Sequence, residues 1–380
     1  LHASAVGFAA IHLFILCAGF ARCLFPWLPS VLLAALFLAG CRPAFSFARG
    51  VWREWRELPR DYLFLAFTTA AVLSAFFLMV ACFRDEIETD AFMYHISAPI
   101  VWLRDGRIYP IPYHMHSQLH FLTQMTNILI VGLPGYSIAL VKLVQWYYAI
   151  LLALGAGLLA GRLAGRRAGM AAVCAVIMAL EVSQVVRGAL MDVGVGLYVF
   201  LGIRHLLVND AGAEDSGMPW RAGIFFGLAW SAKNTGILFF SAAAAAWMAA
   251  AAGGGRKMIR ERLRLLMQTG AVMFLVSLPW IIKNLFFTWN PVYPFLWKIL
   301  PTRPDYYDMA LGFSRYYSGF RGYATPWGVA AHMIDMIPRF ISNVMYRGSD
   351  VMAAGLLLGG LMLCLRRGEK IQGRAALAAF

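Results

Sequence analysis

Long apolar runs separated by short polar connections make up most of the chain. A helix needs about 20 apolar residues to cross the roughly 30 Å of a bilayer's hydrocarbon core. Runs near that length predict an all-α fold, a polytopic transmembrane helical bundle of about ten spans. The run 222–252 counts as two spans because Lys233 and Asn234 interrupt it. The predicted spans are 3–21, 24–41, 62–83, 136–160, 168–186, 190–208, 222–252, 265–287 and 351–365.

Composition supports a membrane protein. Hydrophobic residues make up 61% of the chain and charged residues 14%, whereas soluble domains are about half apolar and a quarter charged. A net charge of +14 would suggest nucleic acid in a soluble protein, but here much of the Arg and Lys lies in short loops between apolar runs. Such loops are typical of the cytoplasmic side of a membrane protein. We therefore expect contact with membrane lipids and no nucleic-acid partner.

The basic loops predict a topology with an acidic loop and a late aromatic segment outside. Arg and Lys are in excess in 42–60 and 253–264, which places both loops in the cytoplasm. Segments 84–118 and 288–350 then face outward. The run 118–133 is short and polar, so we interpret it as a surface or re-entrant helix. The chain is therefore predicted to divide into three parts: an N-terminal hairpin with a basic loop (1–60), a central transmembrane module (61–287), and an external segment with a final span (288–380).

Four carboxylates follow directly on the run 62–83, within six residues: Asp85, Glu86, Glu88 and Asp90. An acidic cluster at a membrane boundary is costly unless water, cations or a substrate compensates it. We interpret it as the edge of an active site, against the alternative of a solvated acidic loop. Apolar residues at helical spacing over 91–103 predict a short surface helix, and Asp105-Gly106 should end it.

Four segments carry a resemblance to a known family. The stretch Asp90–Pro99 (DAFMYHISAP), followed by Trp102-Leu103 and Gly106-Arg107-Ile108, resembles the first external loop of GT-C-type membrane glycosyltransferases. These are polyprenyl-phosphate-sugar-dependent enzymes related to protein O-mannosyltransferases and lipid A aminoarabinose transferases. The other three segments are 227–236 (GLAWSAKNTG), 279–284 (PWIIKN) and 290–295 (NPVYPF). Their order agrees with the family, and the resemblance covers about residues 62–365.

The resemblance implies an activity and two principal site residues. Asp90 matches the family's catalytic acid and would be the general base. Lys233 is similar to a lysine at an external turn that meets the donor phosphate; the alternative is a lysine that extends to the interface as an anchor. The implied reaction moves a sugar, with inversion, from a polyprenyl-phosphate donor to an acceptor glycan, lipid or protein. It would take place on the outer face of a bacterial inner membrane.

Further residues are candidates for substrate contact. One departure from the family lies at 113–120, where many relatives have Pro-Pro-Leu, and it leaves the acceptor open. Asp192 would cap a helix or pair with Arg187, or else line the site. The remaining candidates for donor-phosphate or substrate binding are Tyr94, His95, Arg84, Lys283, Asn284, Arg315 and Arg321.

A divalent metal ion is one interpretation of the histidines. On a helix, His116 and His120 would share a face at the i, i+4 spacing. The carboxylates of Asp85, Glu86 and Glu88 lie nearby in the sequence. The alternative is that these histidines hydrogen-bond phosphate, sugar or water.

Two other functions compete with the enzyme. A transporter or lipid flippase would place charges on broken helices at mid-bilayer, with repeats in the two halves of the chain. The sequence has no such repeat, and its acids cluster in a loop, which favours the enzyme. A non-catalytic membrane subunit that kept the fold is the third alternative.

Overall fold

The computed structural model describes residues 2–36, 38, 49, 62–86, 88–112, 114–209, 218–249 and 255–316. Throughout these ranges the regular secondary structure is helical, which confirms the predicted all-α class. The chain forms two compact units. The first contains Ala10–Ile108 and Thr123–Leu190, and the second contains His2–Ala9, Tyr109–Leu122 and the chain from Met191 onward.

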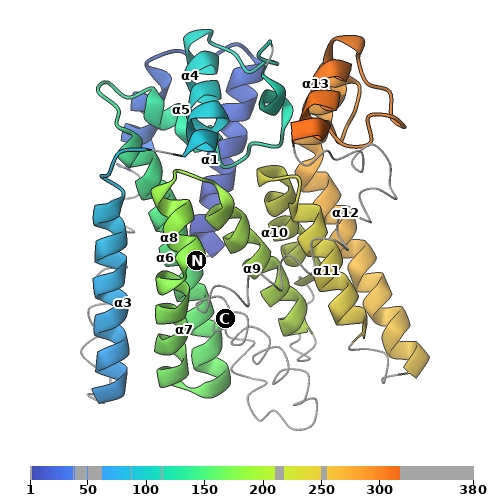
Figure 1. The fold of residues 1–380 in the computed structure, drawn as a ribbon. Helices are drawn as coiled ribbons and strands as arrows, with labels where there is room; N and C mark the ends of the chain where they lie inside the picture. The colour runs from blue at the N-terminus through green and yellow to red at the C-terminus, as the bar shows by residue number, and fades with distance from the viewer. Residues whose placement is uncertain are drawn as a thin grey trace. The chain divides into compact units, whose positions relative to one another are not determined.

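The first unit is built around packed helices (Figure 1). Helix α3 packs against α7, α6 and α8, and short helices follow α3 along the chain. Helix α1 (His2–Phe20) precedes them, with Ala10–Phe20 in this unit. The bounds of the others are α3 Tyr62–Ala81, α4 Ser97–Arg104, α5 Met125–Val131, α6 Ile138–Ala164, α7 Arg166–Met178 and α8 Leu180–Arg187, with a π-helix, η1, at Ala91–Ile96.

Glycines allow α6 and α7 to approach each other closely. The turn between the helices is made by Gly165, whose φ of 89° is strained for any other residue. Across the contact, a Cβ on Gly169 would lie 2.8 Å from the carbonyl oxygen of Gly157 and 3.0 Å from Cα of Gly161. Small residues at such positions let membrane helices pack backbone to backbone.

Gly169→Ala should therefore destabilise the first unit, by about 1–3 kcal/mol as overpacking typically does, because the added methyl group meets backbone that cannot rotate away. Gly161→Ala is the matched control, since its Cβ would meet only Cα of Gly169 at 3.7 Å, an ordinary contact. Chemical unfolding in detergent measures both. Equal stability of the two variants would contradict a backbone contact at Gly169.

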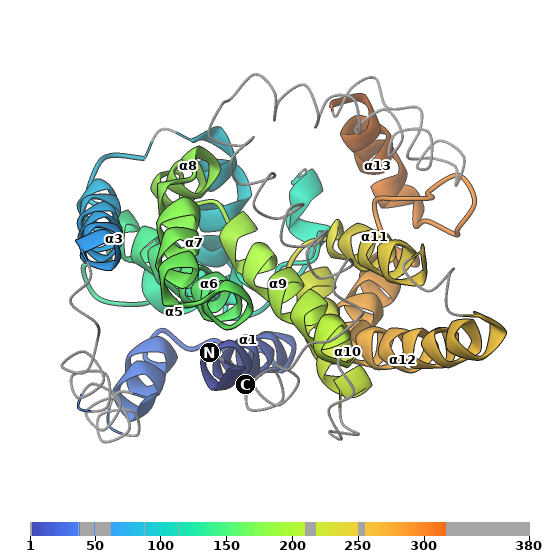
Figure 2. The same cartoon turned by 90° about the horizontal axis from the view of Figure 1, so that it is seen from below.

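The second unit is built around α10, which packs against α9 and α12 (Figure 2). Its buried core includes Phe226 and Trp230 of α10, Trp247 of α11 and Met273 of α12. The bounds are α9 Asp192–Asn209, α10 Met218–Ala232, α11 Gly236–Ala249, α12 Gly255–Thr288 and α13 Pro304–Tyr316, with a 3-10 helix, η2, at Met115–Gln118.

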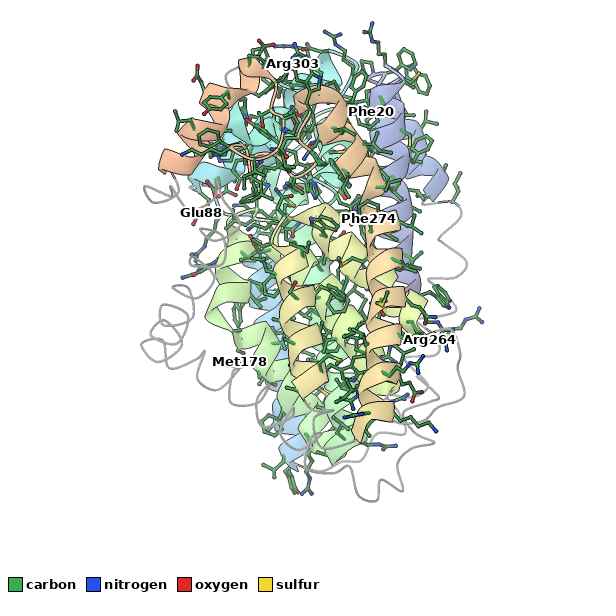
Figure 3. The ribbon with its side chains drawn as sticks, turned by 90° about the vertical axis from the view of Figure 1, so that its right-hand side faces the viewer. Phe20, Glu88, Met178, Arg264, Phe274 and Arg303 are labelled. Atoms are coloured by element: carbon green, nitrogen blue, oxygen red, sulfur yellow. The ribbon has the colours of Figure 1, made fainter. Side chains whose placement is uncertain are left out.

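Three helices of the described residues are long and apolar enough to cross a membrane: α3, α6 and α12. Val6–Phe20 and α11 are shorter apolar helices. Large apolar side chains on α12, such as Leu275 and Phe286, are 63% and 75% exposed, and Phe274 lies on the same helix beyond Arg264 (Figure 3). Such a surface suits contact with lipid. The membrane class is thus supported, whereas the predicted number of about ten spans is not supported by the described helices.

Several predicted boundaries were right and others were wrong. The interruption of 222–252 is confirmed, because α10 ends at Ala232 and α11 begins at Gly236. The predicted span 168–186 is instead broken at Ala179, whose ψ of 130° separates α7 from α8. Helix α12 begins at Gly255 rather than 265, because the Arg, Lys and Leu residues of 256–264 are good helix formers.

The segment 118–133 does not form a crossing helix. It contains the end of η2 and the seven-residue α5, all of whose residues are buried. The helix predicted at 91–103 is confirmed as η1 followed by α4, with Gly106 after it at a φ of 68°, while its place along the membrane surface stays a prediction. The predicted final span 351–365, most of the basic loop 42–60 and Arg321 lie outside the described residues. Arg315 belongs to the last turn of α13.

Candidate functional site

The acidic loop begins where α3 ends, and a lysine from α6 holds its backbone. Lys142 Nζ donates to the carbonyl oxygens of Arg84 (2.9 Å) and Asp85 (3.3 Å). It also lies 3.4 Å from the carboxylate of Glu86, and both side chains are only 1% exposed. The lysine therefore fixes the start of the loop and provides the opposite charge for a buried carboxylate.

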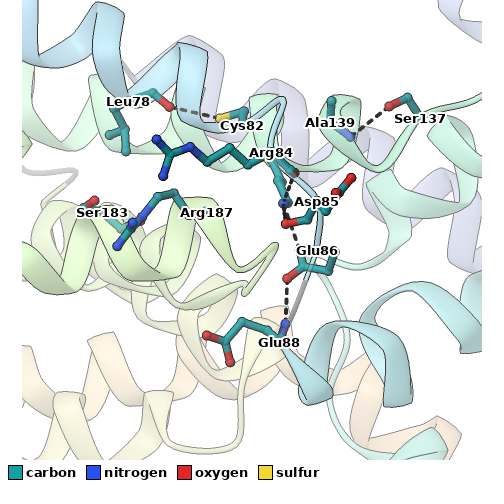
Figure 4. A network of polar contacts seen from close by, with 11 residues as sticks. Leu78, Cys82, Arg84, Asp85, Glu86, Glu88, Ser137, Ala139, Ser183 and Arg187 are labelled. Carbon is teal, nitrogen blue, oxygen red and sulfur yellow. Dashed lines mark hydrogen bonds and ion pairs between the residues drawn. The ribbon is translucent and has the colours of Figure 1, made fainter.

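Glu86 acts within the loop rather than toward solvent. Its Oε1 accepts a hydrogen bond of 2.9 Å from the backbone N–H of Glu88, and Figure 4 shows the two residues along the loop. Because the Glu86 carboxylate is buried and contacts Lys142, its geometry is that of an anchor. A direct role for Glu86 in binding a metal ion or a substrate would require this anchor to open.

The two other acids next to Glu86 are exposed. The backbone carbonyl of Asp85 accepts a hydrogen bond from Lys142, and Asp85 itself is exposed to solvent. Glu88 lies against the turn after α8, since a Cβ on Gly188 would come within 2.5 Å of Glu88 Cγ. Arg84, the first residue of this loop, is likewise exposed (Figure 4). These residues remain candidates for contact with a soluble or headgroup ligand.

Asp90 stands at the beginning of the π-helix η1. Its Oδ2 accepts a hydrogen bond of 3.1 Å from the phenol of Tyr94, one helical turn further on. In the described part of the chain, Tyr94 is the one side-chain partner of this carboxylate. Asp90 is half-buried and Tyr94 is buried. A π-helical turn is rare and is frequently found at functional sites, and this one presents an oriented carboxylate just beyond α3.

His95 points into the first unit and has a structural role. Its Nδ1 lies 2.9 Å from Nε2 of Gln124, and its backbone carbonyl accepts from the amide of Asn127 at 2.7 Å. The ring is 5% exposed and lies against that of Tyr94. In the structure His95 contacts Gln124 and Asn127, and its predicted contact with substrate stays a prediction, whereas the hydroxyl of Tyr94 reaches Asp90.

In the second unit, Lys233 forms an ion pair with Asp192. Lys233 follows the end of α10, and Asp192 is the first residue of α9. The side chains are 47% and 43% exposed, so solvent reaches the pair. Asp192 was expected to cap a helix, pair with Arg187 or line a site; in the structure its partner is Lys233.

Lys283 is buried in α12 and holds a neighbouring segment. Its Nζ donates to the carbonyl oxygens of Gln118 (3.0 Å) and Leu119 (2.8 Å). The ammonium group also lies over the rings of Trp280 and Phe121, at 5.2 and 6.0 Å from their centroids. Through these contacts Lys283 positions the chain before Phe121, and its predicted contact with a donor phosphate stays a prediction.

His120 is buried beside Lys283 and is neutral at physiological pH. Its Nδ1 lies 2.8 Å from the carbonyl oxygen of Trp230, which can only accept, so Nδ1 carries the hydrogen. Burial lowers the pKa of His120 to about 3. The Nε2 atom is therefore left as an acceptor, and His120 should not titrate between pH 5 and 8.

His120 and residues of α10 and α12 carry buried polar atoms without a hydrogen-bond partner among the described residues. Nε2 of His120, Nε1 of Trp280, Oγ of Ser231 and the amide of Asn284 have no hydrogen-bond partner in the described part of the chain. His120 lies next to Trp280, and Asn284 follows Trp280 by one helical turn. Buried polar atoms of this kind are normally satisfied by ordered water or by a polar ligand.

The metal interpretation finds no support in the described ranges. No three His, Cys, Asp or Glu side chains there come together in a way that could hold a metal ion. His116 is buried and faces His114, with ring centroids 6.1 Å apart, while His120 binds the Trp230 carbonyl. The expected i, i+4 relation fails because η2 ends at Gln118, so His116 and His120 do not share one helix face.

The sequence analysis missed Lys142 and the partner of Lys233. A lysine within the apolar run 136–160 was a visible signal, because a charge there is costly without a partner. Neither partner could be identified from spacing, since Glu86 and Asp192 are distant in sequence from the lysines that they contact.

Comparison with protein-family models, with curated proteins and with solved structures gave no match for this chain. The similarity to GT-C glycosyltransferases therefore rests on the four sequence segments alone.

Proposed function

We propose that this protein is an integral membrane glycosyltransferase of the GT-C type. It would transfer a sugar from a polyprenyl-phosphate donor to an acceptor on the outer face of a bacterial inner membrane, with Asp90 as general base. The full chain would then have about ten spans, as the apolar runs predict. Support comes from the four family-like segments and from the position of Asp90 in the loop that follows α3, a helix long enough to span a bilayer.

The orientation of Asp90 is the observation that carries the proposal. A general base must be held within hydrogen-bond reach of the proton that it removes. Asp90 is held by a neutral phenol, and the loop before it is fixed by the buried contact between Lys142 and Glu86. The Glu86 carboxylate is 1% exposed and contacts Lys142, so an acceptor does not reach it, whereas Asp90 is half-buried and oriented by Tyr94. Asp90 is therefore preferred over Glu86 as the acid that takes the proton.

The proposed step is a single displacement. An acceptor hydroxyl oxygen attacks the anomeric carbon of the donor sugar while its proton passes to the Asp90 carboxylate. The bond between that carbon and the phosphate oxygen breaks, and polyprenyl phosphate leaves with the electron pair. Attack opposite the leaving group inverts the configuration at the anomeric carbon.

We further propose that the ion pair of Lys233 and Asp192 receives the donor phosphate. Exposed ion pairs contribute only about 0–1 kcal/mol to stability, so a phosphate can displace Asp192 at little cost. A charge-assisted hydrogen bond from Lys233 to the phosphate would contribute about 1.5–3 kcal/mol to donor binding. The half-exposed position of both side chains permits this exchange.

The test is transfer from a series of defined polyprenyl-phosphate sugars by the protein in lipid nanodiscs. Lys233→Ala should raise the donor KM by about ten- to a hundredfold, as expected for loss of one charge-assisted contact. Asp192→Asn should leave donor use unchanged or improve it, because it removes the competing carboxylate. If both variants lose activity equally, the pair is structural. Lipid scrambling without sugar transfer by any donor would favour the flippase alternative.

A further inference from the structure

A groove runs between three helices of the first unit. Its volume is about 850 Å³, and its lining comes from α3, α6 and α7. Most of the lining side chains are apolar, and they include Val72, Ala75, Leu154, Leu158, Met170 and Val173. The volume lies in the range of about 300–1,000 Å³ that is usual for ligand sites.

The groove has the depth of one bilayer leaflet. Its lining extends from Phe64 to Ala75 on α3 and from Ile150 to Arg162 on α6. At 1.5 Å per residue these stretches are about 17 and 18 Å long, a little over half of the roughly 30 Å hydrocarbon core. Because α3 and α6 are both candidate spans, and Leu154 and Leu158 are 43% and 48% exposed, the open side of the groove suits contact with hydrocarbon.

Two arginines close one end of the groove. Arg162 lies in the last turn of α6 and Arg166 is the first residue of α7, and both line the groove while exposed to solvent. At the other end, Ala75 and Ile150 are apolar. The guanidinium group binds phosphate through paired hydrogen bonds and is more weakly hydrated than an ammonium group. Basic pockets between membrane helices are suited to anionic lipid headgroups.

We infer that this groove binds one anionic phospholipid, with its phosphate at Arg162 and Arg166 and an acyl chain along Val72, Leu154 and Leu158. The site is separate from the acidic loop that carries Asp90. Lys142, which holds the acidic loop, and Arg162 are 20 residues apart on α6, which corresponds to about 30 Å. The inference concerns lipid binding and does not depend on the proposed glycosyltransferase activity.

Native mass spectrometry of the delipidated full chain tests the inference. Phosphatidylglycerol should bind at least about tenfold more tightly than phosphatidylcholine with the same acyl chains. Phosphatidylglycerol carries a net negative charge that the two arginines can bind, whereas phosphatidylcholine has no net charge. Arg162→Gln with Arg166→Gln should remove this preference. The matched control is Arg256→Gln with Lys257→Gln, which removes two exposed cations at the start of α12, a helix that contributes no residue to the lining of the groove. Equal loss in the control would overturn a specific site.

A second variant tests the apolar part of the site. Leu158→Trp keeps both arginines but fills the groove, so it should weaken binding of long-chain phosphatidylglycerol. The effect of inorganic phosphate on thermal stability should be the same in Leu158→Trp as in the wild type. If inorganic phosphate alone stabilises the wild type as strongly as phosphatidylglycerol, or if Leu158→Trp retains full lipid binding, the groove is not a lipid site.

Discussion

Replacing Asp90 by asparagine should lower sugar transfer by about 10²–10⁴-fold, the usual effect of removing a general base. Asparagine keeps the shape of the side chain, and its amide oxygen can still accept the hydrogen bond from Tyr94. It cannot take the proton of the acceptor hydroxyl. Donor binding should remain nearly intact, since the proposed phosphate contact belongs to Lys233. The measurement is kcat and donor KM for a defined polyprenyl-phosphate sugar in nanodiscs.

Amide variants of the other acids supply the controls. Asp85→Asn and Glu88→Gln remove exposed carboxylates and should retain most of the turnover. Tyr94→Phe keeps the base but releases its orientation, so it should reduce kcat less than Asp90→Asn does. If Asp90→Asn retains wild-type turnover while Glu88→Gln abolishes it, the base is misassigned. If no amide variant changes transfer, this loop is not the catalytic centre.

Apolar length and helix breakers predicted much of the fold. The spans at 62–83 and 136–160 correspond to α3 and α6, and the break at Lys233 appears where the apolar run is interrupted. Hydrophobicity alone did not reveal the break at Ala179, because alanine is itself a good helix former and the neighbouring residues are mostly apolar. The length of an apolar run also does not show whether it folds into one long helix or into shorter helices that cannot cross a membrane.

The candidate site was predictable only where its contacts are local. Asp90 and Tyr94 are four residues apart, so a helix through 91–103 brings them together, and their hydrogen bond follows from spacing. His95 and Lys283 have the residue types of a substrate site, yet their partners are Gln124 and the backbone of Gln118 and Leu119. Which way a polar side chain turns depends on contacts distant in sequence, and a single sequence does not contain them.

Replacing Lys142 by methionine should cost about 3–5 kcal/mol of stability, the usual effect of removing one partner of a buried ion pair. Methionine has nearly the volume of lysine but no charge and no donors. It leaves the Glu86 carboxylate, 1% exposed, without the ammonium group that lies 3.4 Å away. It also releases the carbonyl oxygens of Arg84 and Asp85. Chemical unfolding in detergent measures the loss, and limited proteolysis should show faster cleavage within the acidic loop.

The double variant Lys142→Met with Glu86→Gln decides whether the pair itself is responsible. A neutral glutamine carries a much smaller desolvation cost than a buried carboxylate, so the double variant should be more stable than Lys142→Met alone. Lys233→Met is the control at an exposed pair and should cost at most about 1 kcal/mol. If the effects of Lys142→Met and Glu86→Gln simply add, the two residues are not coupled. The acidic loop would then be held by the backbone carbonyl contacts of Lys142, and Asp90 would have to be positioned by η1 and Tyr94 alone.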